Sequence, residues 1–260
     1  MARVIKIDNA LKKQFSYKKQ KQEPKEIVAY FLIVCEGEKT EPNYFRAFPK
    51  KVGKVIYDIE FEGGGISTLK VVEKAIELRD KSTQNYDSVW AVFDRDSFKS
   101  QSFNNAIKKA EANNIKCAWS NEAFELWYLL HFHNRVTAMS RDEYEEAIEK
   151  AVNQKLGKKK KAFKYTKNDP NMFLLLEKIG SIDSAIKWAK ELNDNNIGEK
   201  FAKHNPSTQV YKLVKELKGY SKEFNNEIQE KYNNAQQTTN HRSIICRHPR
   251  PRPRVLAQSV

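Results

Sequence analysis

The sequence is poor in cysteine and has no long apolar run. Its three cysteines, Cys35, Cys117 and Cys246, are widely separated and form no CxxC pair. Neither a disulfide framework nor a zinc cluster is therefore expected. The apolar stretches at 29–35 and 89–93 are far shorter than the roughly 20 residues that cross a bilayer, and the N-terminus lacks the apolar core of a signal peptide. These absences predict a protein of the reducing cytoplasm without a membrane segment.

Acidic residues are outnumbered by basic ones. The chain has 47 lysines and arginines against 33 aspartates and glutamates, which gives a formal charge of +14. Such a charge attracts polyanions, so nucleic acid is the leading expected partner. The alternative is that the lysines only keep the surface soluble, because net charge concerns association rather than fold.

Glycine-rich nucleotide motifs are missing as well. The glycines at 63–65 fit neither the GxGxxG pattern nor the P-loop pattern, and the chain shows no internal repeat. We therefore expect no Rossmann or Walker nucleotide site within the chain.

Strand-like and helix-like segments alternate through the first half of the chain. Strands are predicted near 27–35, 55–61, 87–93 and 115–119, and helices near 40–48, 67–80, 102–113 and 122–133. The segments 27–35 and 87–93 are apolar almost throughout, as expected for strands covered on both faces. This alternation predicts an α/β fold with a mostly parallel sheet flanked by helices.

The second half of the chain differs in pattern from the first. Helices are predicted near 141–156, 170–179, 182–193 and 207–218, with Ser207 or Thr208 as an N-cap and no strong strand. We expect four regions: a basic flexible arm at 1–26, an α/β core at 27–134, a helical extension packed on or completing it at 135–232, and a basic Pro/Arg-rich disordered tail at 233–260.

Acidic residues follow two of the buried strands. Glu36 comes directly after the first strand, and Asp94 and Asp96 follow the segment 87–93. Because the carboxyl ends of neighbouring parallel strands meet at one crevice, these acids are expected to lie together. Oxygen ligands suit Mg²⁺ or Mn²⁺, which predicts phosphate chemistry with Glu36 transferring a proton. The alternative is that these acids cap helices or pair with the many lysines.

Four blocks of the sequence resemble the RloB-like family. These are IVCEGEKTEPNYF at 33–45, VFDRD at 92–96, SNEAFELWYLLHF at 120–132 and NPSTQVYKLV at 205–214. The resemblance runs from residue 27 to about residue 219 and leaves out the basic tail. It implies a Toprim-like core, an association with bacterial anti-phage, abortive-infection loci, and an AAA- or ABC-type ATPase partner.

The same resemblance assigns roles to single residues. It makes Glu36 the first acidic motif and Asp94 and Asp96 the DxD motif, all three being catalytic and metal-binding. Additional candidate ligands are Glu38, Glu41 and Glu125, and candidate nucleic-acid contacts are Lys39, Arg95, Lys158, Lys159, Lys160 and Lys161. The chain departs from the family pattern at Glu122-Ala123, where Pro-Cys or a similar small pair is expected. Glu125 could alternatively be a buried polar anchor, and the lysine run a solvated loop.

Two functions remain open from the sequence. The first is a Mg²⁺- or Mn²⁺-dependent nuclease that hydrolyses DNA or RNA phosphodiesters beside an ATPase. The second is a noncatalytic nucleic-acid-binding or regulatory subunit of the same system. The sequence does not choose between DNA and RNA, because attraction to phosphate is independent of base sequence. It also leaves a homo-oligomer open.

Overall fold

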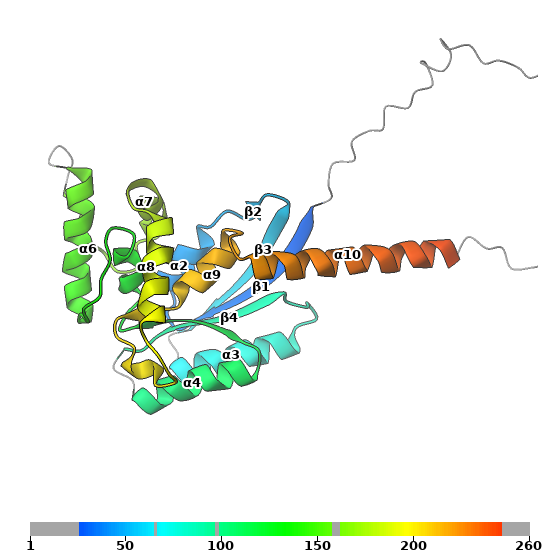
Figure 1. Ribbon diagram of the computed structural model, residues 1–260, viewed down its shortest axis with the longest axis horizontal. Coiled ribbons are helices and arrows are strands. Elements are labelled where there is room, and N and C mark those ends of the chain that lie inside the picture. The colour runs from blue at the N-terminus through cyan, green and yellow to red at the C-terminus, as the bar shows by residue number, and fades with distance from the viewer. Residues whose placement is uncertain (1–25, 65–66, 97–98, 158–161, 246–260) are drawn as a thin grey trace, which may run out of the picture.

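The computed structural model describes residues 26–64, 67–96, 99–157 and 162–245 (Figure 1). Its strands form one sheet in the order β2-β3-β1-β4-β5-β6. The strands are β1 (Ile27–Cys35), β2 (Lys51–Val52), β3 (Val55–Gly63), β4 (Ser88–Asp94), β5 (Lys116–Asn121) and β6 (Ser207–Thr208). β3, β1, β4 and β5 pair in parallel, whereas β2 and β6 are antiparallel.

Helices cover both faces of this sheet. They are α2 (Thr40–Arg46), α3 (Thr68–Lys81), α4 (Ser100–Ala112), α5 (Glu125–Leu129), α6 (Arg141–Leu156), α7 (Met172–Ile179), α8 (Ile182–Asp194), the 3₁₀ helix η1 (Phe201–Lys203), α9 (Val210–Leu217) and α10 (Lys222–Ile245). The mostly parallel α/β fold with a helical C-terminal region is therefore confirmed. None of the helices in the described part of the chain is long and apolar enough to cross a membrane.

The central strands separate two apolar cores. Successive side chains of a strand point to opposite faces, so Leu32 and Val34 of β1 pack with α3 and α4. Phe31 and Ile33 face the other side and pack with α2 and the helices from α5 to α10. Every residue of β4 is buried, which explains the unbroken apolar pattern of this strand.

Two strands and one helix differ from the sequence prediction. β2 and β6 are two residues each and lie at the sheet edges, so they have no alternating pattern to detect. Ser207 and Thr208 pair with β5, and the Ser120 and Thr208 hydroxyls lie 3.0 Å apart. Thr208 Oγ1 also accepts a hydrogen bond from the Val210 amide at the start of α9, at 3.3 Å. The helix predicted at 122–133 is shorter, because β5 continues to Asn121 and α5 covers only Glu125–Leu129.

The C-terminal region also differs from its prediction. α10 extends to Ile245, so residues 233–245 are helical where a disordered tail was expected. At its start the helix packs on the sheet, with the Phe224 ring centroid 5.1 Å from that of Phe31, and it then extends away from the sheet (Figure 1). Residues 1–25 of the predicted arm and residues 246–260 of the predicted tail lie outside the described residues. The four-region division itself stays a prediction.

Candidate functional site

Glu36 and Asp94 lie side by side at the carboxyl ends of the two central strands. β1 and β4 pair with Cys35 opposite Val92, and the Glu36 amide donates a hydrogen bond to the Val92 carbonyl oxygen at 2.8 Å. The Asp94 amide in turn donates to Glu36 Oε2 at 3.1 Å. Parallel pairing thus brings together two acids that are distant in sequence.

Asp96 follows on a tight loop that the β5–α5 connection holds in place. The backbone of Asp96 is left-handed, with φ of 44°, and its amide donates to the Glu122 carbonyl oxygen at 3.2 Å. The Phe124 amide donates to Asp94 Oδ2 at 3.0 Å. Both aspartates of the DxD motif are therefore positioned by backbone contacts from the segment that follows β5.

A cavity of about 360 Å³ collects the predicted acids. Six acidic and three basic side chains line it: Glu36, Glu38, Glu41, Asp94, Asp96 and Glu125 with Lys39, Arg141 and Lys167. Arg95 points elsewhere, since its guanidinium donates to the Asp96 carbonyl oxygen at 3.1 Å and to Ser100 Oγ at 3.3 Å. Lys158, Lys159, Lys160 and Lys161 lie outside the described residues. The structure therefore places every candidate ligand at one site, together with one of the six candidate nucleic-acid contacts.

Glu41 is buried with one of its carboxylate oxygens unpaired. Its side chain is 6% exposed, and Oε2 has no hydrogen-bond partner among the described residues. A Cβ atom on Gly37 would collide with this oxygen. The glycine after Glu36 therefore permits the close approach that places the Glu41 carboxylate in the cavity.

Burial and mutual repulsion raise the pKa values of three of these carboxyl groups. Desolvation raises the pKa of Glu36 to about 7, the Asp94 amide opposes it, and the charges of Glu41 and Asp96 add to it. Desolvation raises the pKa of Asp94 well above its ordinary value, and Glu41 and Glu125 raise it further. The pKa of Glu41 is raised by burial first and by Glu125 second. This concentration of carboxyl groups favours a bound cation.

Arg141 is one of two basic residues of the site that the sequence analysis missed, the other being Lys167. Its Nη2 lies 3.4 Å from Asp94 Oδ2, and its Nη1 lies 3.5 Å from Asp96 Oδ2. Arg141 is the first residue of α6, which starts with a capping box between Ser140 and Glu143. The S-x-x-E pattern predicts this helix start. It contains no signal for which first-turn side chain faces the acids.

The segment 162–168 brings further groups to the cavity. Tyr165 donates its hydroxyl hydrogen to Glu125 Oε1 at 2.9 Å. At the end of the segment, Thr40 Oγ1 donates to Asn168 Oδ1 at 2.6 Å, and Lys167 lines the cavity. Glu125 is thus a buried carboxylate with a defined partner, and it lies at the acidic cluster as the sequence suggested. No sequence pattern predicts the path of 162–168.

The aromatic residues in and next to α5, together with His131, are core residues, whereas His133 is exposed. Phe124, Trp127 and Tyr128 are each no more than 2% exposed, so these side chains serve in packing. His131 Nδ1 lies 2.9 Å from the Trp127 carbonyl oxygen, and burial lowers the pKa of His131 to about 4. A neutral, packed histidine follows from both observations.

The donor set of the cavity suits a hard cation in its chemistry. Carboxylate oxygens are the ligands that Mg²⁺ and Mn²⁺ prefer, and the unpaired Oε2 of buried Glu41 is free to serve as one. In the part of the chain that the structure describes, no three His, Cys, Asp or Glu side chains are arranged as a metal site. The positive charge beside Asp94 and Asp96 is instead that of Arg141.

Comparison with known proteins identifies one family. The family model described as RloB-like protein matches residues 31–217, a span that contains every acidic residue of the cavity as well as Arg141 and Lys167. No curated protein and no solved structure matches the chain.

Proposed function

The chain belongs to the RloB-like family, and from this membership and the acidic cavity we propose that it is a metal-dependent nuclease of a bacterial anti-phage, abortive-infection system. In this proposal it acts in the cytoplasm, hydrolyses DNA or RNA phosphodiesters, and has an AAA- or ABC-type ATPase as partner. One observation carries the proposal. Glu36, Asp94 and Asp96 share a single cavity with basic side chains.

The acidic side chains have separate parts in this proposal. Glu36, Asp94 and Asp96 would hold the cation, with Glu41 contributing through its unpaired Oε2. A bound Mg²⁺ or Mn²⁺ would offset charge on the scissile phosphate and make a water molecule more acidic. Oε2 of Glu36 accepts the Asp94 amide hydrogen, which leaves Oε1 to take the proton from the attacking water.

The basic side chains supply the contacts for a polyanionic substrate. Arg141 and Lys167 line the cavity, and Lys39 joins them from the loop before α2. A guanidinium can exchange a carboxylate partner for a phosphate oxygen, because it binds both groups with the same planar set of donors. The net charge of +14 would favour the approach of nucleic acid from a distance.

A specific observation also favours the noncatalytic alternative. Arg141 already balances part of the charge of Asp94 and Asp96 without a metal ion. In that case the protein would be a nucleic-acid-binding or regulatory subunit, and the acids would serve to position Arg141. The two functions differ in one measurable property, which is cleavage.

The test is a cleavage assay on labelled DNA and on total RNA, with Mg²⁺ or Mn²⁺, with EDTA, and with and without any ATPase that is encoded beside the protein. The wild-type chain is compared with the Asp94→Asn, Asp96→Asn double variant. Asp80→Asn is the matched control, because Asp80 lies on α3 outside the cavity. The proposal expects cleavage that EDTA and the double variant abolish and that the control retains.

The other outcomes are equally informative. Cleavage by the double variant at the wild-type rate would show that the site lies elsewhere. Nucleic-acid binding of equal strength in both proteins, with no cleavage under any condition, would establish the noncatalytic subunit instead.

A further inference from the structure

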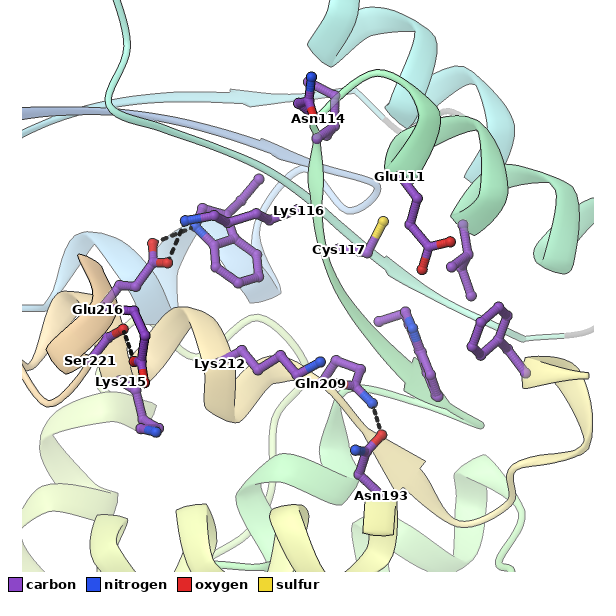
Figure 2. Close-up of a pocket in the computed structure, with 16 residues that line it drawn as sticks. Glu111, Asn114, Lys116, Cys117, Asn193, Gln209, Lys212, Lys215, Glu216 and Ser221 are labelled. Carbon is purple, nitrogen blue, oxygen red and sulfur yellow. Dashed lines mark hydrogen bonds and ion pairs between the residues drawn. The ribbon is translucent and has the colours of Figure 1, made fainter. Parts of the chain in front are cut away.

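A second cavity, of about 680 Å³, lies at the edge of the sheet along β5 (Figure 2). Side chains of α4 border it on one face of the sheet and side chains of α9 on the other. Its lining shares no residue with the acidic cavity. The function proposed above therefore leaves this groove unexplained.

The backbone edge of β5 is open in this groove. β6 pairs only with Ser120 and Asn121, and the last contact along this edge is the Gln209 amide, which donates to the Trp119 carbonyl oxygen at 2.8 Å. Backbone groups alternate between the two edges of a strand. Cys117 therefore directs its N–H and C=O to the same side as Trp119, where no described backbone group bonds to them.

The two walls of the groove differ in chemistry. On the α4 side lie Ile107 and Phe201, which belong to the apolar core of that face, together with one acidic side chain, Glu111. On the α9 side lie Lys212 and Lys215 (Figure 2). A strand inserted between these walls would direct alternate side chains to each of them.

Several polar groups in the groove have no partner among the described residues. Gln209 is 6% exposed, and its Oε1 makes no hydrogen bond. Lys212 and Lys215 form no ion pair, whereas the neighbouring Lys116 Nζ lies 2.6 Å from Glu216 Oε1. Desolvation lowers the pKa of Lys212, which is consistent with an ammonium group that is held in the groove. Lys212 is exposed and Lys215 half-buried, so water can solvate both ammonium groups, whereas the unpaired Oε1 of buried Gln209 indicates a missing partner.

We propose that this groove binds an extended peptide segment of a partner protein, in which acidic and apolar side chains alternate, as an additional strand beside β5. Its main chain would pair with Cys117, its acidic side chains with Lys212 and Lys215, and its apolar side chains would pack toward Ile107. The open edge from Lys116 to Ala118 is about 10 Å long at roughly 3.3 Å per residue, which suits a short segment.

The shape of the groove argues for a single strand as its occupant. Neighbouring strands lie about 4.8 Å apart, and α4 and α9 border the next strand position on both faces. A second copy of the chain could not align its own β5 edge there, because its α4 and α9 would collide with these helices. The basic α9 wall also disfavours the lysine- and arginine-rich residues 1–25 and 246–260 of this chain.

The test uses the full-length protein and a fluorescein-labelled eight-residue peptide of alternating glutamate and valine. Fluorescence anisotropy measures its affinity against two control peptides: one that alternates lysine and valine, and one with N-methylated backbone amides. The proposal expects at least tenfold weaker binding of both controls. It also expects the Lys212→Glu, Lys215→Glu variant to bind the glutamate–valine peptide at least tenfold more weakly. The Lys70→Glu, Lys74→Glu variant on α3 carries the same change of charge and should keep the wild-type affinity.

Amide hydrogen exchange of the segment around Cys117 provides the second measurement. Exchange should be fast in the free protein and slow when the glutamate–valine peptide is bound. Equal affinity for all three peptides, or full affinity in the Lys212→Glu, Lys215→Glu variant, would refute the proposal. Slow exchange in the free chain would also overturn it, because a segment of this chain or a second copy would then occupy the groove.

Discussion

Arg141 and Asp94 form an ion pair in which Nη2 and Oδ2 are 3.4 Å apart. The pair joins the start of α6 to the carboxyl end of β4. The arginine lies among acids whose pKa values burial raises, and its charge lowers the pKa values of Glu36, Glu41 and Asp94. Arg141 therefore supplies positive charge that reduces the repulsion among the carboxylates of the cavity.

Replacement of Arg141 should destabilise the fold in a pH-dependent way. We expect Arg141→Gln to lower the free energy of unfolding by about 2 kcal/mol at pH 8, because Asp94 loses its partner in a partly buried site. At pH 5 the loss should be smaller, since the raised pKa values allow the carboxyl groups to be protonated. Urea unfolding at both pH values measures this difference. Lys109→Gln, which breaks an exposed pair with Glu73, should cost less than about 0.5 kcal/mol at either pH.

The pH dependence of the wild-type protein has a definite sign at Glu36. Its pKa is 4.5 in the unfolded chain and about 7 in the folded protein, so the folded state binds more protons between these values. Stability should therefore fall as the pH rises from 4.5 to 7, and the contribution of Glu36 should not change above that range. The slope of the unfolding free energy against pH, measured by urea unfolding, should be reduced in Glu36→Gln. It should be retained in Glu38→Gln, which lies at the cavity rim. Equal slopes in all three proteins would contradict this prediction.

Gly37→Ala should affect cation binding more than stability. The new Cβ would collide with Glu41 Oε2, and this oxygen ends a flexible side chain that can move at low cost. We expect the free energy of unfolding to change by less than about 1 kcal/mol. Under the proposed function Mn²⁺ raises the melting temperature of the wild-type protein, and we expect the variant to lose this stabilisation. Differential scanning fluorimetry with and without Mn²⁺ tests both expectations. Recovery of the Mn²⁺ effect in a Gly37→Ala, Glu41→Asp double variant would show that the collision is the cause.

Tyr165→Phe should remove one hydrogen bond to a buried carboxylate. The Tyr165 hydroxyl donates to Glu125 Oε1 at 2.9 Å, and Glu125 is 3% exposed. We expect a loss of about 1–3 kcal/mol, since the carboxylate is left without this donor. Tyr86→Phe provides the control, because Tyr86 makes the same kind of bond to Glu60 at an exposed position. This variant should lose less than about 0.5 kcal/mol of unfolding free energy. Chemical denaturation of the two variants decides between a buried contact and an incidental one.

The sequence predicted those parts of the molecule that depend on strand order and burial. Unbroken apolar segments identified β1 and β4, and the parallel topology then placed Glu36 beside Asp94. Every acid assigned to the site lines the same cavity. These features follow from regular backbone geometry, which hydrophobic patterns report directly.

The rest of the site depends on irregular backbone, for which no such pattern exists. Arg141 enters the cavity from a helix start, and Lys167 enters it from the segment 162–168 that Asn168 fastens to Thr40. Arg95, a candidate nucleic-acid contact, lies between the two site aspartates but does not line the cavity. Its guanidinium instead bonds to Ser100 Oγ and the Asp96 carbonyl oxygen, since neighbouring residues on a tight loop direct their side chains apart.

The edge of β5 shows the same limit. A strand of ordinary composition at Lys116–Asn121 gives no indication that its partner β6 covers only its last two residues. The gap arises because the chain turns into α9 immediately after Gln209. Edge exposure is a property of chain path rather than of local sequence.

The position of α3 makes this helix a suitable attachment site for labels. This helix packs on the opposite face of the sheet from α2, α5 and α9, and no residue of it lines either cavity. Its outward side chains, such as Glu77 and Lys81, are exposed. A fluorophore or a surface tether attached there would leave both the acidic cavity and the β5 groove accessible, so α3 is the helix on which to immobilise this protein for single-molecule measurements.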